Sequence, residues 1–261
     1  SYAAYLNISH PDLIPFLEMR KPTGDPNVRC LNLHHGINIT DDFMDAVVEG
    51  KSFDLRDTAD GRITETIDAR KLFNRIIETR FRTGEPYLNY IDTANRALPQ
   101  PLKDKGLKIH GSNLCNEIHL PTNADRTAVC CLSSLNLELY EEWKDTSIIE
   151  DLVTMLDNVL EYFIENAPNS ISRARFSASQ ERSIGLGAMG FHYLLQSKGL
   201  PWESEAAQEL NKTVFKMIRD RANAQSLKLG TERGEAPDMV GTGERFSHKL
   251  AIAPNASSAV I

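Results

Sequence analysis

Segments with a strand-like period of two alternate along this chain with longer segments of helical period. Apolar and other residues alternate over 31–39, which predicts a strand. Apolar residues recur at helical spacing over 68–82 and again over 204–229, which predicts two helices. Strands that alternate with helices favour an α/β fold with parallel strands.

The expected boundaries of these elements follow from glycine and from polar stretches. Gly84 and Gly230 are each expected to end a helix. Residues 52–66 and 95–107 are polar and are interpreted as loops. Neither repeats nor a linker interrupts the pattern, so we predict a single domain over 1–261.

Composition excludes several classes of function. The chain has 261 residues, 41% of them hydrophobic and 25% charged, which suits a globular domain with a sizeable core. Its net charge of -7 argues against duplex DNA or RNA as a partner. No apolar run reaches the roughly 18 residues of a membrane helix, and no signal peptide is visible. Four cysteines do not form a disulfide scaffold, so we expect a reducing compartment, the cytoplasm.

Both ends of the chain lie inside patterned sequence. It opens with a strand-like run, Ser1-Tyr-Ala-Ala-Tyr-Leu6, without an initiator Met, and it closes in apolar sequence at Val260-Ile261. We therefore expect a piece of a larger protein, produced by a split gene, by processing or by truncation.

The segment 111–122 carries the most informative chemistry. If it is extended, side chains two apart share a face and lie roughly 6.5–7 Å from each other. Asn113, Cys115 and Glu117 would then combine an amide, a thiol and a carboxylate on one face. A single cysteine is also commonly a small buried apolar residue, so spacing alone leaves both interpretations open.

Four motifs in order resemble ribonucleotide reductase large subunits. Asn113-Leu-Cys-Asn-Glu-Ile118 is similar to the active-site loop of that family, and Ala128-Val-Cys130 to its redox-cysteine strand. Arg182-Ser-Ile-Gly-Leu-Gly-Ala-Met-Gly190 is similar to a glycine segment of the family. The run Ala253-Pro-Asn-Ala-Ser-Ser258 resembles the loop that holds the substrate diphosphate. The resemblance covers essentially the whole chain and implies part of a ten-stranded α/β barrel.

The resemblance also implies a radical mechanism. Cys115 would become a thiyl radical that takes the 3′ hydrogen of the ribose, Glu117 would be the general base, and Asn113 would bind the ribose hydroxyls. Cys130 and a second cysteine would supply two electrons by forming a disulfide. The phosphate-binding residues would be Pro254, Asn255, Ala256, Ser257 and Ser258.

Departures from the whole family enzyme limit what this chain is expected to do alone. The nucleotide-sensing amino-terminal region, the second redox cysteine and the carboxy-terminal cysteine tail of the family are not in the sequence, so the chain alone is expected to be inactive. It would need complementary large-subunit segments, a small radical-generating subunit with a diiron or other dimetal centre, and thioredoxin or glutaredoxin as reductant. Leu114 and Asn116 favour the aerobic, diiron class. Cys131 departs from the polar residue usual after the redox cysteine.

Alternative interpretations remain for several motifs. The chain could be a non-catalytic reductase-derived fragment that binds or completes another chain. Gly185-x-Gly-x-x-Gly190 matches a dinucleotide fingerprint, which would make this a dehydrogenase domain if a strand covered 176–184. We favour close backbone packing at these glycines. Cys30 with His34 and His35, or Cys130 with Cys131, does not form the paired four-ligand pattern of structural zinc, so no metal site is predicted.

Overall fold

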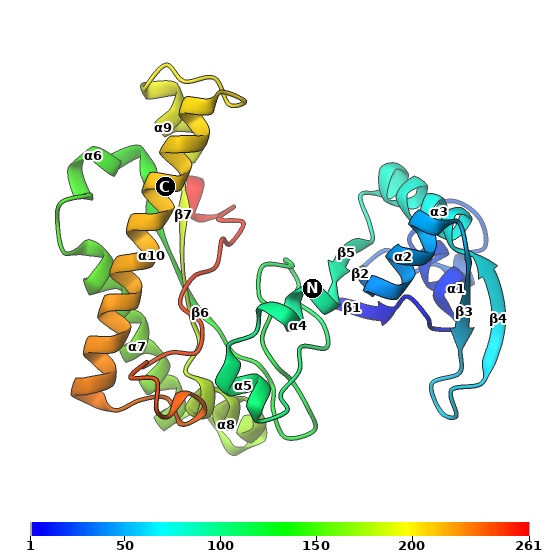
Figure 1. Ribbon diagram of the computed structural model, residues 1–261, viewed down its shortest axis with the longest axis horizontal. Coiled ribbons are helices and arrows are strands. Elements are labelled where there is room, and N and C mark those ends of the chain that lie inside the picture. Colours follow the sequence, from blue (N-terminus) through cyan, green and yellow to red (C-terminus); the bar gives the residue numbers. More distant parts are fainter. Residues whose placement is uncertain (1, 261) are drawn as a thin grey trace. The chain divides into compact units, whose positions relative to one another are not determined.

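The computed structural model describes residues 2–260, which divide into two compact units (Figure 1). The first unit takes the described residues up to Leu98 together with Ile109–Leu120. The second takes Pro99–Lys108 and the described residues from Pro121 onward. None of the helices within residues 2–260 has the length and apolar character of a membrane-spanning segment.

The first unit is built on a parallel three-stranded sheet in the order β1-β2-β5. Its strands are β1 (Tyr2–Asn7), β2 (Leu33–Ile39) and β5 (Tyr87–Tyr90). Helix α1 (Leu13–Glu18) follows β1, and α2 (Asp41–Glu49) and α3 (Ala69–Thr83) lie between β2 and β5 in the chain. Crossovers of this kind allow parallel pairing. The predicted strand at 31–39 is confirmed, two residues shorter at its start, and so is the α/β class with parallel strands.

Apolar side chains from the sheet and these helices form the core of the first unit. Its fully buried members include Ile8, Leu13, Ile37, Phe43 and Ile76. Helix α3 begins where predicted, because the Asp68 side chain accepts a hydrogen bond from the Lys71 amide, and it ends at Gly84 with φ of 80°. Phe81, by contrast, is 92% exposed, so the expected apolar face of this helix does not extend over its last turn.

The prediction of a loop over 52–66 is wrong. Strands β3 (Ser52–Arg56) and β4 (Ile63–Asp68) form an antiparallel hairpin there. Leu55 is fully buried, whereas most of β4 is exposed. The hairpin is held partly by polar contacts, such as the hydrogen bond of 2.7 Å from Thr66 Oγ1 to Asp54 Oδ1. Polar strands of this kind give little apolar alternation to detect in a sequence.

The second unit contains a parallel pair of strands and long helices. Strand β6 (Cys131–Asn136) pairs with β7 (Ile184–Met189). Its helices include α7 (Ile148–Asn166), α8 (Ser172–Glu181), α9 (Phe191–Ser197) and α10 (Glu205–Arg233), with the short α6 (Tyr140–Trp143) after β6. Leu135 and Ile184 from the strands, Leu156 and Leu160 from α7, and Ile218 from α10 belong to one buried core.

Two further boundaries differ from the sequence prediction. The region 95–107 is not a loop, because α4 (Ile91–Ala97) ends within it and α5 (Gln100–Asp104) lies inside it. Gly230 does not end α10, which continues to Arg233. A Cβ atom at Gly230 would lie 2.0 Å from the carbonyl oxygen of Gly243, so glycine is needed there for close backbone approach.

Candidate active site

The loop that carries Cys115 is a turn rather than the extended segment considered from the sequence. The Asn116 amide donates to the Asn113 carbonyl at 3.2 Å, and Asn116 has φ of 63°. The Asn113 side-chain oxygen accepts hydrogen bonds from the amides of Glu117, at 3.0 Å, and Ile118, at 3.1 Å. Asn113 therefore shapes the loop through Oδ1.

The turn leaves Cys115 exposed and places Glu117 within its electrostatic reach. Partial loss of hydration at the thiol, followed by repulsion from Glu117, raises the pKa of Cys115 above its ordinary value. Cys115 is therefore held as a protonated thiol at neutral pH. Glu117 Oε2 is buried and has no hydrogen-bond partner among the described residues. An unpartnered carboxylate oxygen beside a thiol can accept a proton from a bound hydroxyl.

Tyr5 on β1 supports this loop, a role that the sequence did not reveal. Its hydroxyl hydrogen-bonds the Asn113 carbonyl at 2.8 Å and lies 3.2 Å from Asn116 Oδ1. Its ring occupies space left by two glycines: a Cβ at Gly36 would lie 2.4 Å from Tyr5 Cε1, and one at Gly111 3.3 Å from Cγ. Burial is the main cause that raises the pKa of Tyr5 to about 12. The hydroxyl therefore remains a donor through the neutral range.

A second tyrosine and a buried carboxylate lie near the same loop. Burial, followed by electrostatic repulsion mainly from Glu85, raises the pKa of Tyr87. Glu85 is bound by His34 Nδ1 at 2.5 Å, by the His35 amide at 3.1 Å and by Arg20 Nε at 3.2 Å. Burial alone would raise the Glu85 pKa, but these partners together lower it. No side chains within 2–260 form a group of three or more His, Cys, Asp or Glu residues suited to a metal ion.

In the second unit, Cys131 is the first residue of β6 and Cys130 directly precedes it, and the two side chains point to opposite sides. Cys131 packs against the buried core, and burial raises the pKa of its thiol. A Cβ at Gly185 would lie 3.1 Å from Cys130 Sγ and 3.0 Å from the Ala251 side chain. Cys130 therefore faces the segment around Ala251, on the side of the strand pair away from the core.

The glycine motif belongs to strand β7 and serves close packing. A Cβ at Gly187 would lie 2.3 Å from the Ala251 carbonyl oxygen. The strand that a dinucleotide fingerprint would require before it is absent, since 172–181 is helix α8. The structure therefore supports close backbone approach and not a dehydrogenase fingerprint.

The predicted phosphate loop follows that same segment. Asn255 accepts a hydrogen bond of 2.7 Å from Ser134 Oγ on β6 and has φ of 53°. Ser257 and Ser258 are exposed, and a short 3₁₀ helix spans Ser258–Val260. Pro254 and Ala256 complete the loop. Cys130 and this loop thus lie on one face of the β6–β7 pair, whereas Asn113, Cys115 and Glu117 belong to the first unit.

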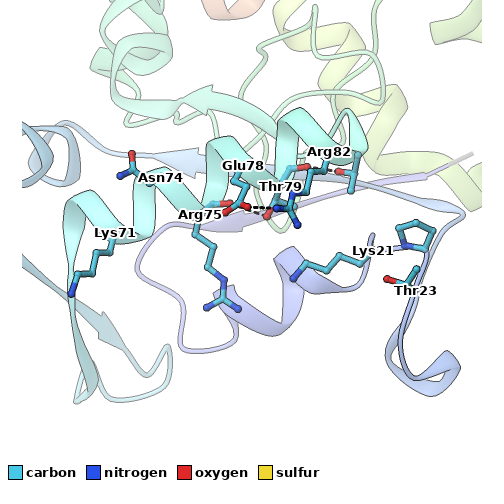
Figure 2. A pocket seen from close by; sticks show the side chains of 10 residues that line it. Lys21, Thr23, Lys71, Asn74, Arg75, Glu78, Thr79 and Arg82 are labelled. Atoms are coloured by element: carbon cyan, nitrogen blue, oxygen red, sulfur yellow. Dashed lines mark hydrogen bonds and ion pairs between the residues drawn. The ribbon is translucent and has the colours of Figure 1, made fainter.

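A groove on the first unit shares no residue with the cysteine loop. It has a volume of about 650 Å³ and lies along one face of α3 and the segment after α1 (Figure 2). Lys71, Arg75 and Arg82 line it from α3, and Lys21 lines it from the other side. Glu78 forms an ion pair of 2.5 Å with Arg82. Its charged lining side chains are mostly basic.

Comparisons with known proteins agree on one family. The family model described as ribonucleotide reductase, barrel domain, matches residues 1–251. A protein of Frog virus 3 described as a ribonucleoside-diphosphate reductase large subunit is 59% identical over 264 residues, which is 100% of this chain and 47% of that protein. The large subunit from Invertebrate iridescent virus 3 is 45% identical over 316 residues, covering 100% of this chain and 50% of that protein.

A solved structure shows the same likeness in three dimensions. The class Id ribonucleotide reductase alpha subunit of Actinobacillus ureae matches with a TM-score of 0.86 and 32% sequence identity, over 98% of this chain and 46% of that chain. The chain spans about half the length of the curated relatives named above.

Proposed function

This chain belongs to the ribonucleotide reductase family, whose barrel domain it matches over residues 1–251, and we propose that it carries the residues that reduce the ribose of a nucleotide. The observation that carries the proposal is the turn that exposes the protonated Cys115 thiol beside Glu117, whose buried Oε2 has no partner among residues 2–260. The fold of that family is a ten-stranded α/β barrel, and this chain forms part of such a barrel.

In the proposed reaction, Cys115 acts as the radical residue. Its thiyl radical takes the hydrogen atom from C3′ of the ribose, and Glu117 accepts the proton of the 3′ hydroxyl. The C2′–O bond then breaks, and the 2′ hydroxyl leaves as water with a proton from one of the two reducing thiols. A hydrogen from the second thiol is added at C2′, and Glu117 returns its proton to the 3′ oxygen. The hydrogen atom returns from Cys115 to C3′ at the end, which regenerates the thiyl radical. Asn113 holds the turn through Oδ1, and its amide nitrogen is proposed to donate to the ribose hydroxyls.

Two electrons must reach the substrate to balance this loss of water. We assign them to Cys130 and a second cysteine in another part of the enzyme, which form a disulfide as two thiols are oxidised. The orientation of Cys130 away from the core supports this role, since Cys131 packs into the core. Thioredoxin or glutaredoxin would reduce the disulfide in the complete enzyme.

The phosphates of the ribonucleotide are proposed to bind at the loop Pro254–Ser258. Ser257 and Ser258 are exposed and offer hydroxyl donors, while Ser134 fixes Asn255 at the start of the loop. The chain is proposed to work with complementary large-subunit segments and a small radical-generating subunit, whose dimetal centre would supply the radical. We place this enzyme in the cytoplasm.

The proposal is tested by substitution of cysteines in the complete enzyme that contains this chain, with its radical-generating subunit present. Cys115→Ser should abolish conversion of ribonucleotide to deoxyribonucleotide, because a hydroxyl does not replace the thiol as radical carrier. Cys30→Ser is the matched control and should retain turnover, since Cys30 lies outside the loop. Undiminished turnover by Cys115→Ser would reject the proposal, and inactivity of the wild-type complex would favour a non-catalytic fragment.

A further inference from the structure

Three asparagines form one row across the sheet of the first unit. In the parallel register, Asn7 of β1 is opposite Asn38 of β2, and Asn38 is opposite Asn89 of β5. Asn89 Nδ2 donates to Asn38 Oδ1 at 2.8 Å, and Asn38 Nδ2 donates to Asn7 Oδ1 at 3.0 Å. Asn38 and Asn89 are each only 3% exposed. These three residues are called the asparagine ladder below.

The asparagine ladder contacts both ends of the loop that carries Cys115. Asn38 Nδ2 also donates to the His110 carbonyl oxygen at 2.8 Å. At the other end, His119 Nε2 lies 2.8 Å from Asn89 Oδ1. Because Asn89 Oδ1 can only accept, His119 must donate through Nε2–H. The hydrogen bonds are therefore all donated in the same direction. His119 donates to Asn89, Asn89 donates to Asn38, and Asn38 donates to the carbonyl of His110 at the start of the loop.

We propose that the asparagine ladder and His119 are positioning residues that hold the two ends of the loop and so fix the place of Cys115. This inference rests on the proposed function for the role of Cys115, but the geometry of the ladder does not. Between its two attachment points at His110 and His119, the turn makes no hydrogen bond with the asparagine ladder within residues 2–260. A shift at either point would therefore move the thiol relative to a bound ribose.

The three side chains of the asparagine ladder depend on one another, because burying an amide costs free energy unless it is hydrogen-bonded. A buried amide without a partner costs more than its hydrogen bond contributes, so loss of one member leaves its neighbours unsatisfied. Burial also lowers the pKa of His119, which keeps the imidazole neutral near pH 7. Since both the neutral Nε2–H form and the charged form donate through Nε2, the contact with Asn89 survives mild acid.

The test uses the complete enzyme with Asn89→Leu, His119→Leu and His119→Gln. Thr64→Val is the control, because it removes one hydrogen bond in the same unit, from Thr64 Oγ1 to the Leu55 carbonyl in the β3–β4 hairpin. Hydrogen–deuterium exchange of amides 111–118 and alkylation of Cys115 by iodoacetamide report the loop directly. Turnover gives kcat and KM for the ribonucleotide.

The leucine variants are expected to speed exchange in 111–118 and alkylation of Cys115, with little change in the rest of the unit. Their kcat should fall roughly 10- to 100-fold, the effect of a displacement of about 1 Å, while KM changes little. His119→Gln keeps a donor and should recover part of both effects. Thr64→Val should resemble wild type.

Three outcomes would overturn the inference. One is unchanged exchange and alkylation in both leucine variants, and another is faster exchange spread evenly over the first unit. The third is a His119→Gln variant no better than His119→Leu, which would assign the effect to ring packing. His119 is only partly buried, so its variants remain informative if Asn89→Leu fails to fold. Exchange and alkylation do not need turnover, so they separate failure of this inference from failure of the proposed function.

Discussion

The hydroxyl of Tyr5 donates a hydrogen bond of 2.8 Å to the carbonyl of Asn113, two residues before Cys115 in the chain. Strand β1 thereby supports the middle of a loop whose ends contact the neighbouring strands. The space for the ring exists only because Gly36 and Gly111 have no side chains. A strand residue far from Cys115 in sequence is thus part of the support of the reactive thiol.

Removal of the Tyr5 hydroxyl should loosen the turn without emptying the space that the ring fills. Tyr5→Phe loses the bond to Asn113 and the contact with Asn116, a change worth roughly 0.5–1.5 kcal/mol. We expect faster alkylation of Cys115, a fall of a few fold in turnover, and a thermal unfolding midpoint lower by only a few degrees. Tyr2→Phe, an exposed tyrosine on the same strand, is the control. Equal alkylation rates for Tyr5→Phe and wild type would contradict this role.

Glu117 is predicted to control both the reaction and the acidity of Cys115. Glu117→Gln removes the negative charge that, after burial, raises the Cys115 pKa, so that pKa should fall in the variant. The pH dependence of Cys115 alkylation measures it, and the rate profile should move to lower pH. Turnover should fall roughly 10²- to 10⁴-fold because the base is lost, with substrate binding nearly intact.

Glu117→Asp provides the comparison for this prediction. It keeps the charge on a shorter side chain, so the Cys115 alkylation profile should stay closer to that of wild type while turnover still falls. A Glu117→Gln profile that moves to higher pH would show that Glu117 does not act on Cys115 through its charge. Equal turnover by Glu117→Gln and wild type would remove its assignment as base.

The sequence predicted those parts of the fold that depend on neighbouring residues. Asp68 and Gly84 could be assigned as the ends of α3 because a cap and a left-handed glycine act within one helical turn. The β3–β4 hairpin was missed because most of β4 is exposed and polar. Gly230 was misread because its partner, the Gly243 carbonyl, belongs to the segment that folds back on α10 after the helix ends.

The candidate site was predictable only in part for the same reason. Cys115 and Glu117 could be selected by residue type and by the resemblance of their loop to a known one. Tyr5 could not, because its role depends on the register that places it opposite Gly36. The asparagine ladder likewise depends on the alignment of three strands, and asparagines scattered along a sequence carry no sign of that alignment.

The redox thiol of the second unit is expected to be Cys130, which directly precedes β6. The strand register turns Cys131 into the core and Cys130 toward Gly185 and Ala251. The complete enzyme is allowed one turnover without external reductant, free thiols are blocked, and the new disulfide is mapped. We expect it to join Cys130 to a cysteine elsewhere in the enzyme. Cys131→Ser should retain this bond, whereas a disulfide through Cys131 would overturn the assignment and leave that of Cys115 untouched.

Glu181, at the end of α8, should make the stability of the second unit depend on pH. The residue is fully buried, its Oε1 accepts from Ser177 Oγ at 2.9 Å, and its Oε2 has no partner within the described chain. Burial is the main cause that raises its pKa from an ordinary value of 4.5 to about 7. The folded state therefore binds the Glu181 proton more tightly than the unfolded state does.

The sign of the effect follows from this difference in proton binding. Below pH 4.5 both states hold the proton, and the contribution of Glu181 to stability is fully present. As the pH rises toward about 7, the unfolded chain releases the proton while the folded chain keeps it, so this contribution declines. It is lost above that value, and the total change is on the order of 3 kcal/mol.

Glu181→Gln tests this directly, because the amide resembles the protonated carboxyl and does not titrate. Urea unfolding is followed by the fluorescence of Trp143 and Trp202, which both belong to the second unit. The free energy of unfolding of wild type, relative to that of Glu181→Gln, should decrease between pH 4 and pH 8 by about 3 kcal/mol. Glu203→Gln, at an exposed position, controls for the loss of one negative charge. If the difference in the free energy of unfolding between wild type and Glu181→Gln stays constant over this pH range, Glu181 is not protonated in the folded chain near neutrality.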